Sequence, residues 1–160
     1  MYNDSTSATD TTVEHLTFEV GGQSYAINIS AVREIRSWTE PSGMPATEPY
    51  VMGVINLRGE VLPLLDLAAK LGLKTPEINE RSVIVVIEAE EVTVGFLVDS
   101  VSNIIAPSVD DMKPPPESAK NTGNAYVSAL TLIDEKLIRI LDLSALLPSK
   151  VEVEVFDEAS

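Results

Sequence analysis

Short runs of hydrophobic and polar residues predict that this chain folds mainly into β-strands. Each run is four to seven residues long, and most are joined in pairs by turn residues such as Gly21-Gly22 and Arg58-Gly59. Many short strands with little helix favour small barrels or a sandwich. The predicted hairpins pair residues 16–20 with 25–29, 51–57 with 60–65, 83–87 with 92–98, and 126–132 with 136–141.

Short helical turns are expected where a residue able to cap a helix follows a strand. Asp66 precedes the mostly apolar residues 67–71, and Gly72 follows them, which is the usual chemistry of a helix start and stop. Asp142 begins a similar turn at residues 144–147. Ser30 and Asp99 are interpreted in the same way, and the turn after Ser30 would carry Val32, Glu34 and Ile35.

The sequence contains two copies of one unit. Residues 50–71 align without a gap with residues 126–147, and residues 25–35 align with residues 94–104. Two copies predict two small barrels that pack together on their aliphatic faces.

The differences between the copies identify candidate functional residues. Glu34 in the first copy becomes Asn103 in the second, and Arg58-Gly59 becomes Asp134-Glu135. Residues that the fold needs should recur in both copies, whereas residues of a functional site can occur in one. Glu34 and Arg58 are therefore the first candidates, and the first half is expected to carry the active surface.

Composition narrows the function classes. The chain has 160 residues and a net charge of −14, which argues against binding to nucleic acid or to an anionic membrane. It has no cysteine, no signal-peptide pattern at its start and no apolar run long enough for a membrane helix. We expect a soluble cytoplasmic protein with a disordered tail at residues 1–13 and an acidic tail at residues 149–160.

Catalytic chemistry finds little support in these residues. The only histidine, His15, lies next to the predicted N-terminal tail. Asp66, Asp99 and Asp142 end apolar strands, where carboxylates can bind a metal, but helix capping explains all three equally simply. Capping is the favoured interpretation, and a metal-dependent enzyme that uses Asp66 and Asp99 remains the alternative.

Arg58 has two interpretations as well. It could be an ordinary exposed arginine at a hairpin turn, or a guanidinium held by Glu34 and presented to a protein partner. Val32 and Ile35 beside Glu34 would suit either a protein interface or the core.

Four segments together resemble the CheW family of chemotaxis coupling proteins, over roughly residues 16–147. The most specific of them is GVINLRG followed by PLLDL within residues 53–67. The other three are FEVGGQSYAINISAVREI (residues 18–35), VGFLVDSV (residues 94–101) and LIRILDLSALL (residues 137–147).

The resemblance implies an all-β fold with short helices, in which two intertwined, five-stranded SH3-like barrels share an aliphatic core. A single CheW-like domain would span residues 14–148. Its first barrel would lie mainly in residues 16–74 and its second mainly in residues 81–147, with exchange of strands between them left open.

The resemblance also implies a non-catalytic adaptor without cofactor or metal. Such an adaptor couples the cytoplasmic tips of methyl-accepting chemoreceptors to the regulatory domain of the histidine kinase CheA. It is a monomer alone, joins receptor arrays, and neither binds nucleic acid nor inserts into the membrane. A scaffold of a chemosensory pathway unrelated to motility is the alternative within the family.

Residue by residue, the resemblance assigns two surfaces. One departure from the family pattern is Ala129, where relatives often carry glycine, as this chain does at Gly53. The implied kinase-binding residues are Val32, Glu34, Ile35, Gly53, Arg58 and Gly59, and the implied receptor-binding residues are Ile84, Val101 and Ala129.

Overall fold

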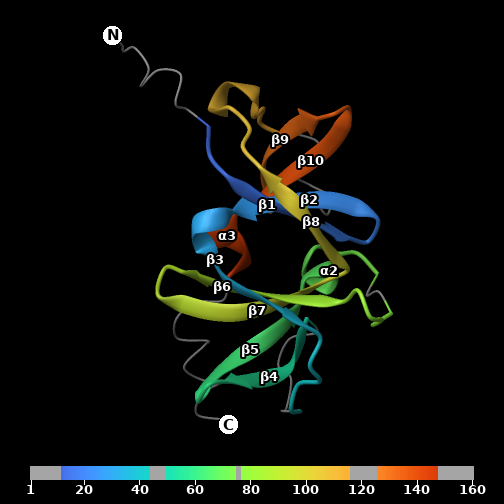
Figure 1. The fold of residues 1–160 in the computed structure, drawn as a ribbon, viewed down its shortest axis with the longest axis vertical. Helices are drawn as coiled ribbons and strands as arrows, with labels where there is room; N and C mark the ends of the chain where they lie inside the picture. Colours follow the sequence, from blue (N-terminus) through green and yellow to red (C-terminus); the bar gives the residue numbers. More distant parts are fainter. Residues whose placement is uncertain (1–11, 44–49, 75–76, 116–125, 148–160) are drawn as a thin grey trace.

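The structure, a computed structural model, describes residues 12–43, 50–74, 77–115 and 126–147 (Figure 1). The predicted tails fall almost entirely outside these residues. The strands are β1 (His15–Val20), β2 (Gln23–Asn28), β3 (Val32–Ser37), β4 (Val51–Leu57), β5 (Glu60–Asp66), β6 (Val83–Ala89), β7 (Val92–Val98), β8 (Ser100–Ile105), β9 (Val127–Ile133) and β10 (Lys136–Leu141). The short helices are η1 (Ile29–Ala31), α2 (Leu67–Lys70), η2 (Val109–Asp111) and α3 (Leu143–Leu146).

All four predicted hairpins are present, and each turns through two residues with positive φ. This turn geometry matches the right-handed twist of the paired strands. Glycine adopts it without strain, but here non-glycine residues occupy most of the positions. The turn pairs are Gly21-Gly22, Arg58-Gly59, Glu90-Glu91 and Asp134-Glu135.

The strands form two sheets, and each sheet contains strands from both copies of the repeat. One has the order β8-β1-β2-β10-β9, and we call it the upper barrel; the other has the order β3-β6-β7-β5-β4, and we call it the lower barrel (Figure 1). In each barrel the first two strands of one copy pair with the last three of the other. The prediction of two intertwined five-stranded barrels is confirmed, and the exchange of strands is reciprocal.

Each barrel is closed by residues that follow its edge strand β3 or β8, the third strand of each copy. In the lower barrel, Ser42 and Val54 exchange backbone hydrogen bonds of 2.8 and 3.0 Å. In the upper barrel, Lys113 and Leu130 exchange bonds of 2.8 and 2.7 Å. Val54 and Leu130 occupy equivalent places in the repeat, so both barrels close in the same way.

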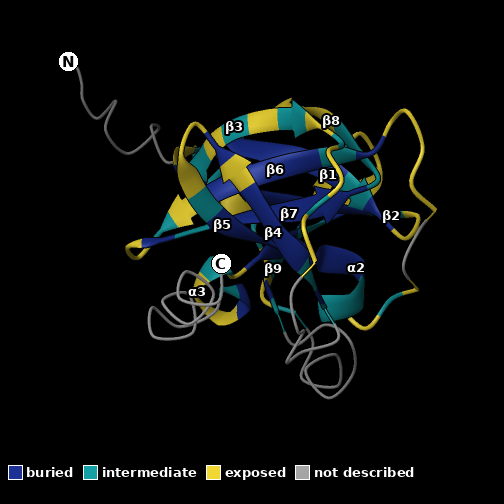
Figure 2. Cartoon of the chain, turned by 90° about the horizontal axis from the view of Figure 1, so that it is seen from below, coloured by how far each residue is buried: buried dark blue, intermediate teal, exposed yellow. Residues whose placement is uncertain are grey.

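The hydrophobic core has three parts. The largest lies between the barrels and takes one face of most strands, including Phe18, Tyr25 and Phe96. Each barrel also has an interior of its own, which is larger and more apolar in the lower barrel. Figure 2 shows β6 and β7 buried along most of their length, whereas β3 alternates between exposed and partly buried residues.

Two predicted helical turns are wrong. Residues 32–37 and 100–105 are the strands β3 and β8, and only the 3-10 helix η1 precedes β3. Asn28, not Ser30, caps η1, because its side chain accepts a hydrogen bond from the Ser30 N–H at 2.9 Å. Strand exchange explains the error, since β3 and β8 each gain backbone partners from the other copy, β6 and β1 respectively.

Candidate functional site

Arg58 lies at the tip of the β4–β5 hairpin in the lower barrel. Its φ of 52° and the φ of 89° at Gly59 make the tight turn, and Asn56 Oδ1 accepts the Gly59 N–H at 2.9 Å. The Arg58 side chain is 65% exposed. The hairpin therefore holds the backbone firmly and leaves the guanidinium free to reach across the barrel mouth.

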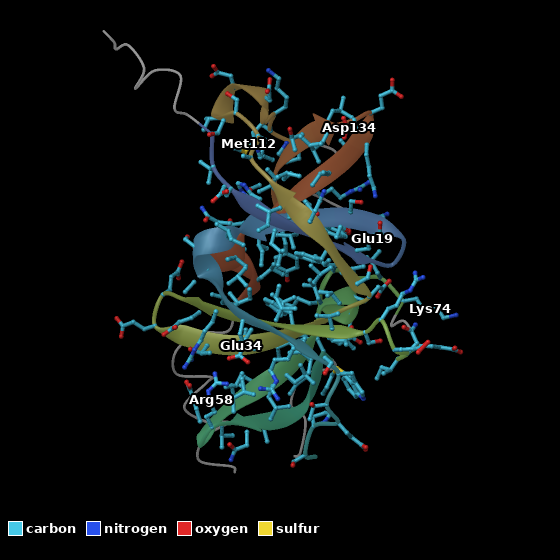
Figure 3. The ribbon with its side chains drawn as sticks, viewed as in Figure 1. Glu19, Glu34, Arg58, Lys74, Met112 and Asp134 are labelled. Atoms are coloured by element: carbon cyan, nitrogen blue, oxygen red, sulfur yellow. The ribbon has the colours of Figure 1, made fainter. Side chains whose placement is uncertain are left out.

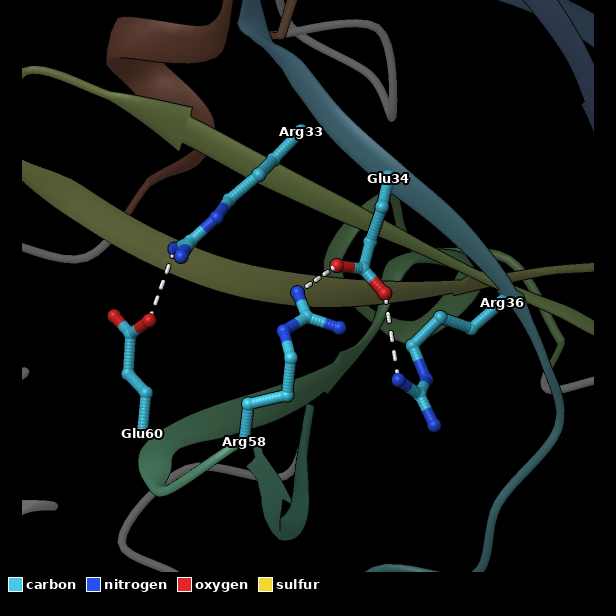
Figure 4. A network of polar contacts seen from close by, with 5 residues as sticks. All are labelled: Arg33, Glu34, Arg36, Arg58 and Glu60. Atoms are coloured by element: carbon cyan, nitrogen blue, oxygen red, sulfur yellow. Dashed lines mark hydrogen bonds and ion pairs between the residues drawn. The ribbon is translucent and has the colours of Figure 1, made fainter.

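The predicted contact between Glu34 and Arg58 is confirmed. Arg58 Nη2 donates to Glu34 Oε1, and Arg36 Nη1 donates to Glu34 Oε2 at 3.3 Å (Figure 4). Both oxygens of this carboxylate are thus used by arginines. Glu34, however, lies on the edge strand β3 and not on a helical turn, so the contact joins β3 to the turn between β4 and β5.

A third ion pair extends this cluster. Arg33 Nη1 lies 3.0 Å from Glu60 Oε1, beside the Arg58 turn (Figure 4). Sequence reasoning did not single out Arg33, Arg36 or Glu60. Arg33 and Arg36 could have been found from a strand interpretation of residues 32–37, which places Arg36 on the same face as Glu34 and Arg33 on the other. No such signal marks Glu60.

The charges in this cluster stabilise one another. The hydrogen bond from Arg58 lowers the pKa of Glu34, and the hydrogen bond to Glu34 raises the pKa of Arg58. A carboxyl group with a lowered pKa keeps its contact above its ordinary pKa and loses it as the pH falls through the lowered one. The Glu34–Arg58 contact is therefore intact at neutral pH.

The other predicted kinase-facing residues surround this cluster unequally. Ile35 is 47% exposed on β3, whereas Val32 is partly buried and packs against the core between the barrels. Gly59 is exposed. Gly53 is buried, with a φ of 145°, and a Cβ there would lie 2.3 Å from the Ser42 carbonyl oxygen. Barrel closure alone thus accounts for glycine at residue 53.

The three predicted receptor-facing residues do not share one hydrophobic cluster. Ile84 has no exposed surface and belongs to the interior of the lower barrel. Val101 is partly buried against the core between the barrels, and Ala129 against the interior of the upper barrel. Ile84 therefore cannot touch a partner in this conformation, and only Val101 and Ala129 have surface to offer.

Of the three aspartates predicted to cap helices, Asp66 and Asp142 do so and Asp99 does not. Asp66 accepts the Ala69 N–H at 3.3 Å and Asp142 accepts the Ser144 N–H at 3.1 Å, so both cap helices as predicted. Asp99 caps nothing. Its Oδ2 accepts the Gly21 N–H at 3.0 Å, which ties the β7–β8 connection to the β1–β2 turn.

The described part of the chain has no grouping of side chains typical of a metal site. There, no three or more His, Asp or Glu side chains are grouped so that they could hold a metal. His15 is the first residue of β1 and is 5% exposed, and its Nδ1 lies 2.9 Å from the Val13 carbonyl oxygen. None of the helices in the described residues has the length and hydrophobicity to cross a bilayer.

Known proteins resemble this chain over most of its length. The chain is 42% identical to the chemotaxis protein CheW of Rhizobium meliloti (strain 1021) over 137 residues, which cover 86% of this chain and 88% of that protein. It is 33% identical to the chemotaxis protein CheW of Bacillus subtilis (strain 168), with coverages of 82% and 85%.

The fold has a close counterpart among solved structures. The scaffolding protein TtCheW from Thermoanaerobacter tengcongensis superposes with a TM-score of 0.79 at 26% identity, over 87% of this chain and 94% of that chain. The sequence profile of the CheW-like domain matches residues 14–151. Because that match covers most of the chain and several relatives exceed 30% identity, this protein belongs to the CheW-like domain family.

Proposed function

We propose that this protein is a non-catalytic adaptor that couples chemoreceptor tips to the histidine kinase CheA in chemotaxis signalling. Membership of the CheW-like family supports the proposal, as do relatives that are named chemotaxis proteins and a structural neighbour named a scaffolding protein. The adaptor acts in the cytoplasm as a monomer that joins receptor arrays. It needs neither metal nor cofactor.

The observation that carries the proposal is the Glu34–Arg58 contact. It occurs in only one of two copies of the same unit, since Asn103 and Asp134 stand at the equivalent positions. An exposed ion pair adds little to stability, so stability alone is a poor reason for it. Its better use is to hold the planar Arg58 guanidinium in one orientation at the barrel mouth, ready for the regulatory domain of CheA.

The receptor would bind elsewhere on the molecule. A receptor tip is a helical hairpin, and it would place apolar side chains against Val101 and Ala129 on the upper barrel. Val32, Gly53 and Gly59 would serve the kinase-facing surface chiefly by shaping it. Ile84 would support the lower barrel from inside.

The enzyme alternative receives no support from a specific contact. Asp66 is accounted for as a helix cap, and Asp99 holds a backbone turn. An adaptor in a pathway unrelated to motility would use the same two surfaces. The pathway is therefore a matter of which kinase and receptors the cell supplies.

Calorimetric titration against the regulatory domain of CheA tests the proposal. We expect a dissociation constant on the order of micromolar, as for other small transient interfaces, and no change after treatment with a chelator. Absence of binding to that domain, or specific binding of a metal or nucleotide that Asp66→Asn removes, would contradict it.

A further inference from the structure

The upper barrel contains a pocket at the position equivalent to the Glu34–Arg58 cluster. It has a volume of about 210 Å³ and opens beside the β9–β10 turn. Figure 3 shows Asp134 at the tip of this turn, at the opposite end of the molecule from Arg58. Its polar lining includes Thr17, Ser24, Asn103 and Asp134, and its apolar lining is Ile105, Ile133 and Ile138.

The repeat shows what fills the same place in the lower barrel. Asn103 corresponds to Glu34, Asp134 to Arg58, and Ile105 to Arg36. In the lower barrel, Glu34, Arg36 and Arg58 meet across the barrel mouth in ion pairs. In the upper barrel, the shorter or apolar side chains leave the mouth open as a pocket.

The interior beneath the pocket is also more polar. Thr17 and Thr131 stand where the lower barrel has Val86 and Ile55, and both threonines are buried. The Thr17 hydroxyl donates to Asn103 Oδ1 at 2.6 Å and accepts the Asn103 backbone N–H at 3.0 Å, so the amide is held against the barrel wall with one lone pair of Oδ1 left to accept. Thr131 Oγ1 has no hydrogen-bond partner among the described residues.

The lining suits a side chain with an apolar stem and a cationic, donor-rich end. Hydroxyl and amide oxygens and the Asp134 carboxylate are acceptors, while the isoleucines offer an aliphatic surface. Arginine combines three methylenes with five N–H donors and no acceptor. We propose that the upper-barrel pocket binds an arginine side chain supplied by a partner protein, in place of the intramolecular Arg58 of the lower barrel.

Lys136, which also lines the pocket, does not cancel this preference. Its Nζ lies 3.2 Å from Glu19 Oε2, so its charge is already paired with a carboxylate of β1. Asp134 and Glu135 at the turn leave the rim acidic. The proposal concerns the upper barrel alone and does not depend on the kinase assignment of the lower one.

Chemical-shift mapping by NMR, with N-acetyl-arginine amide as the probe, tests the pocket in the full-length protein. We expect saturable shifts confined to the amides of Ser24, Ser102, Asn103 and Lys136, with a dissociation constant of roughly millimolar, typical of a single side chain. The citrulline analogue has almost the same shape but no charge, and it should bind at least about tenfold more weakly.

Asp134→Asn is the informative variant because asparagine tolerates the positive φ of 52° at this turn position. It should weaken arginine binding at least fivefold, whereas Glu135→Gln, a neighbouring charge outside the pocket lining, should leave it within twofold. Shifts spread over the whole acidic surface, equal binding of citrulline, or unchanged binding to Asp134→Asn would each overturn the proposal. Loss of CheA binding in Arg58→Ala concerns the lower barrel, so the two proposals can fail separately.

Discussion

The mouths of the lower and upper barrels have the same backbone but different chemistry. Each is formed by a β-strand that follows the first hairpin and by the tip of a later hairpin, and the strand pairing is equivalent in both. The lower mouth is occupied by Glu34, Arg36 and Arg58, and the upper mouth is an open pocket with Asp134 at its rim. The fold therefore fixes the backbone of both mouths, whereas the side chains that line them differ between the two copies.

The largest expected effect concerns a glycine that only one copy retains. Gly53→Ala would place a Cβ 2.3 Å from the Ser42 oxygen at a φ of 145°, so the lower barrel could not close as it does. We expect a loss of roughly 3 kcal/mol or more in the free energy of unfolding, measured by urea denaturation.

The equivalent residue of the upper barrel provides the matched control. Ala129 has no positive φ, and Ala129→Gly should cost only about 1 kcal/mol or less, from added chain entropy. Equal effects at residues 53 and 129 would mean that closure does not dictate the glycine.

Charging the upper barrel separates the two proposed partners. Val101→Glu should weaken binding to a receptor-tip fragment by at least about tenfold, because a carboxylate would have to be desolvated at an apolar contact. Binding to the CheA regulatory domain should remain within twofold. Equal losses for both partners, or a fall in melting temperature, would show that the half-buried Val101 acts only in the core.

Removal of the capping aspartate should cost more stability in the buried copy than in the exposed copy. Asp66 is 5% exposed and caps α2, whereas Asp142 caps α3 at the surface. Asp66→Ala should cost about 1 to 2 kcal/mol of unfolding free energy and Asp142→Ala about 0.5 to 1, while asparagine should be tolerated at both. Loss of adaptor activity in a stable Asp66→Asn variant would indicate a chemical role instead.

The smallest effect is expected at Asp99, the aspartate that caps no helix. Burial raises the pKa of this carboxyl group, and Glu19 and Asp66 add to the rise, while the Gly21 N–H opposes it. A raised carboxyl pKa means that the folded protein loses stability from this group as the pH rises through that pKa. Asp99→Asn should therefore raise the melting temperature by about 1 to 2 °C at pH 7.

The pH dependence provides the check on Asp99. The gain should shrink as the pH falls through the raised pKa of Asp99, because the wild-type carboxyl group is then protonated. A variant that is less stable than wild type at pH 7 would show that the charge itself holds the Gly21 turn.

The hairpins could be predicted from sequence because each turn and its two strands are neighbours along the chain. Gly21-Gly22 and Arg58-Gly59 mark two-residue turns without knowledge of the rest of the chain. Local sequence instead favours helical turns at β3 and β8, because Ser30 and Asp99 are residue types that can cap helices. Their strand state depends on partners from the other copy, which local sequence cannot specify.

The candidate site was predicted in part for a different reason. The comparison of copies identified Glu34 and Arg58 because they do not recur, and that logic needs no structure. It did not identify Arg33, Arg36 or Glu60, which join only when the barrel closes. The upper pocket was also beyond reach, because a cavity is set by the side chains that surround it.

Arg58→Ala tests the central claim most directly when stability and kinase binding are measured on the same preparation. The claim predicts a melting temperature within roughly 3 °C of wild type, since an exposed ion pair contributes little. It predicts at least a tenfold loss of affinity for the CheA regulatory domain, with Arg58→Lys intermediate because lysine lacks the planar fork. Wild-type affinity in a folded Arg58→Ala protein, or unfolding of that variant, would contradict it.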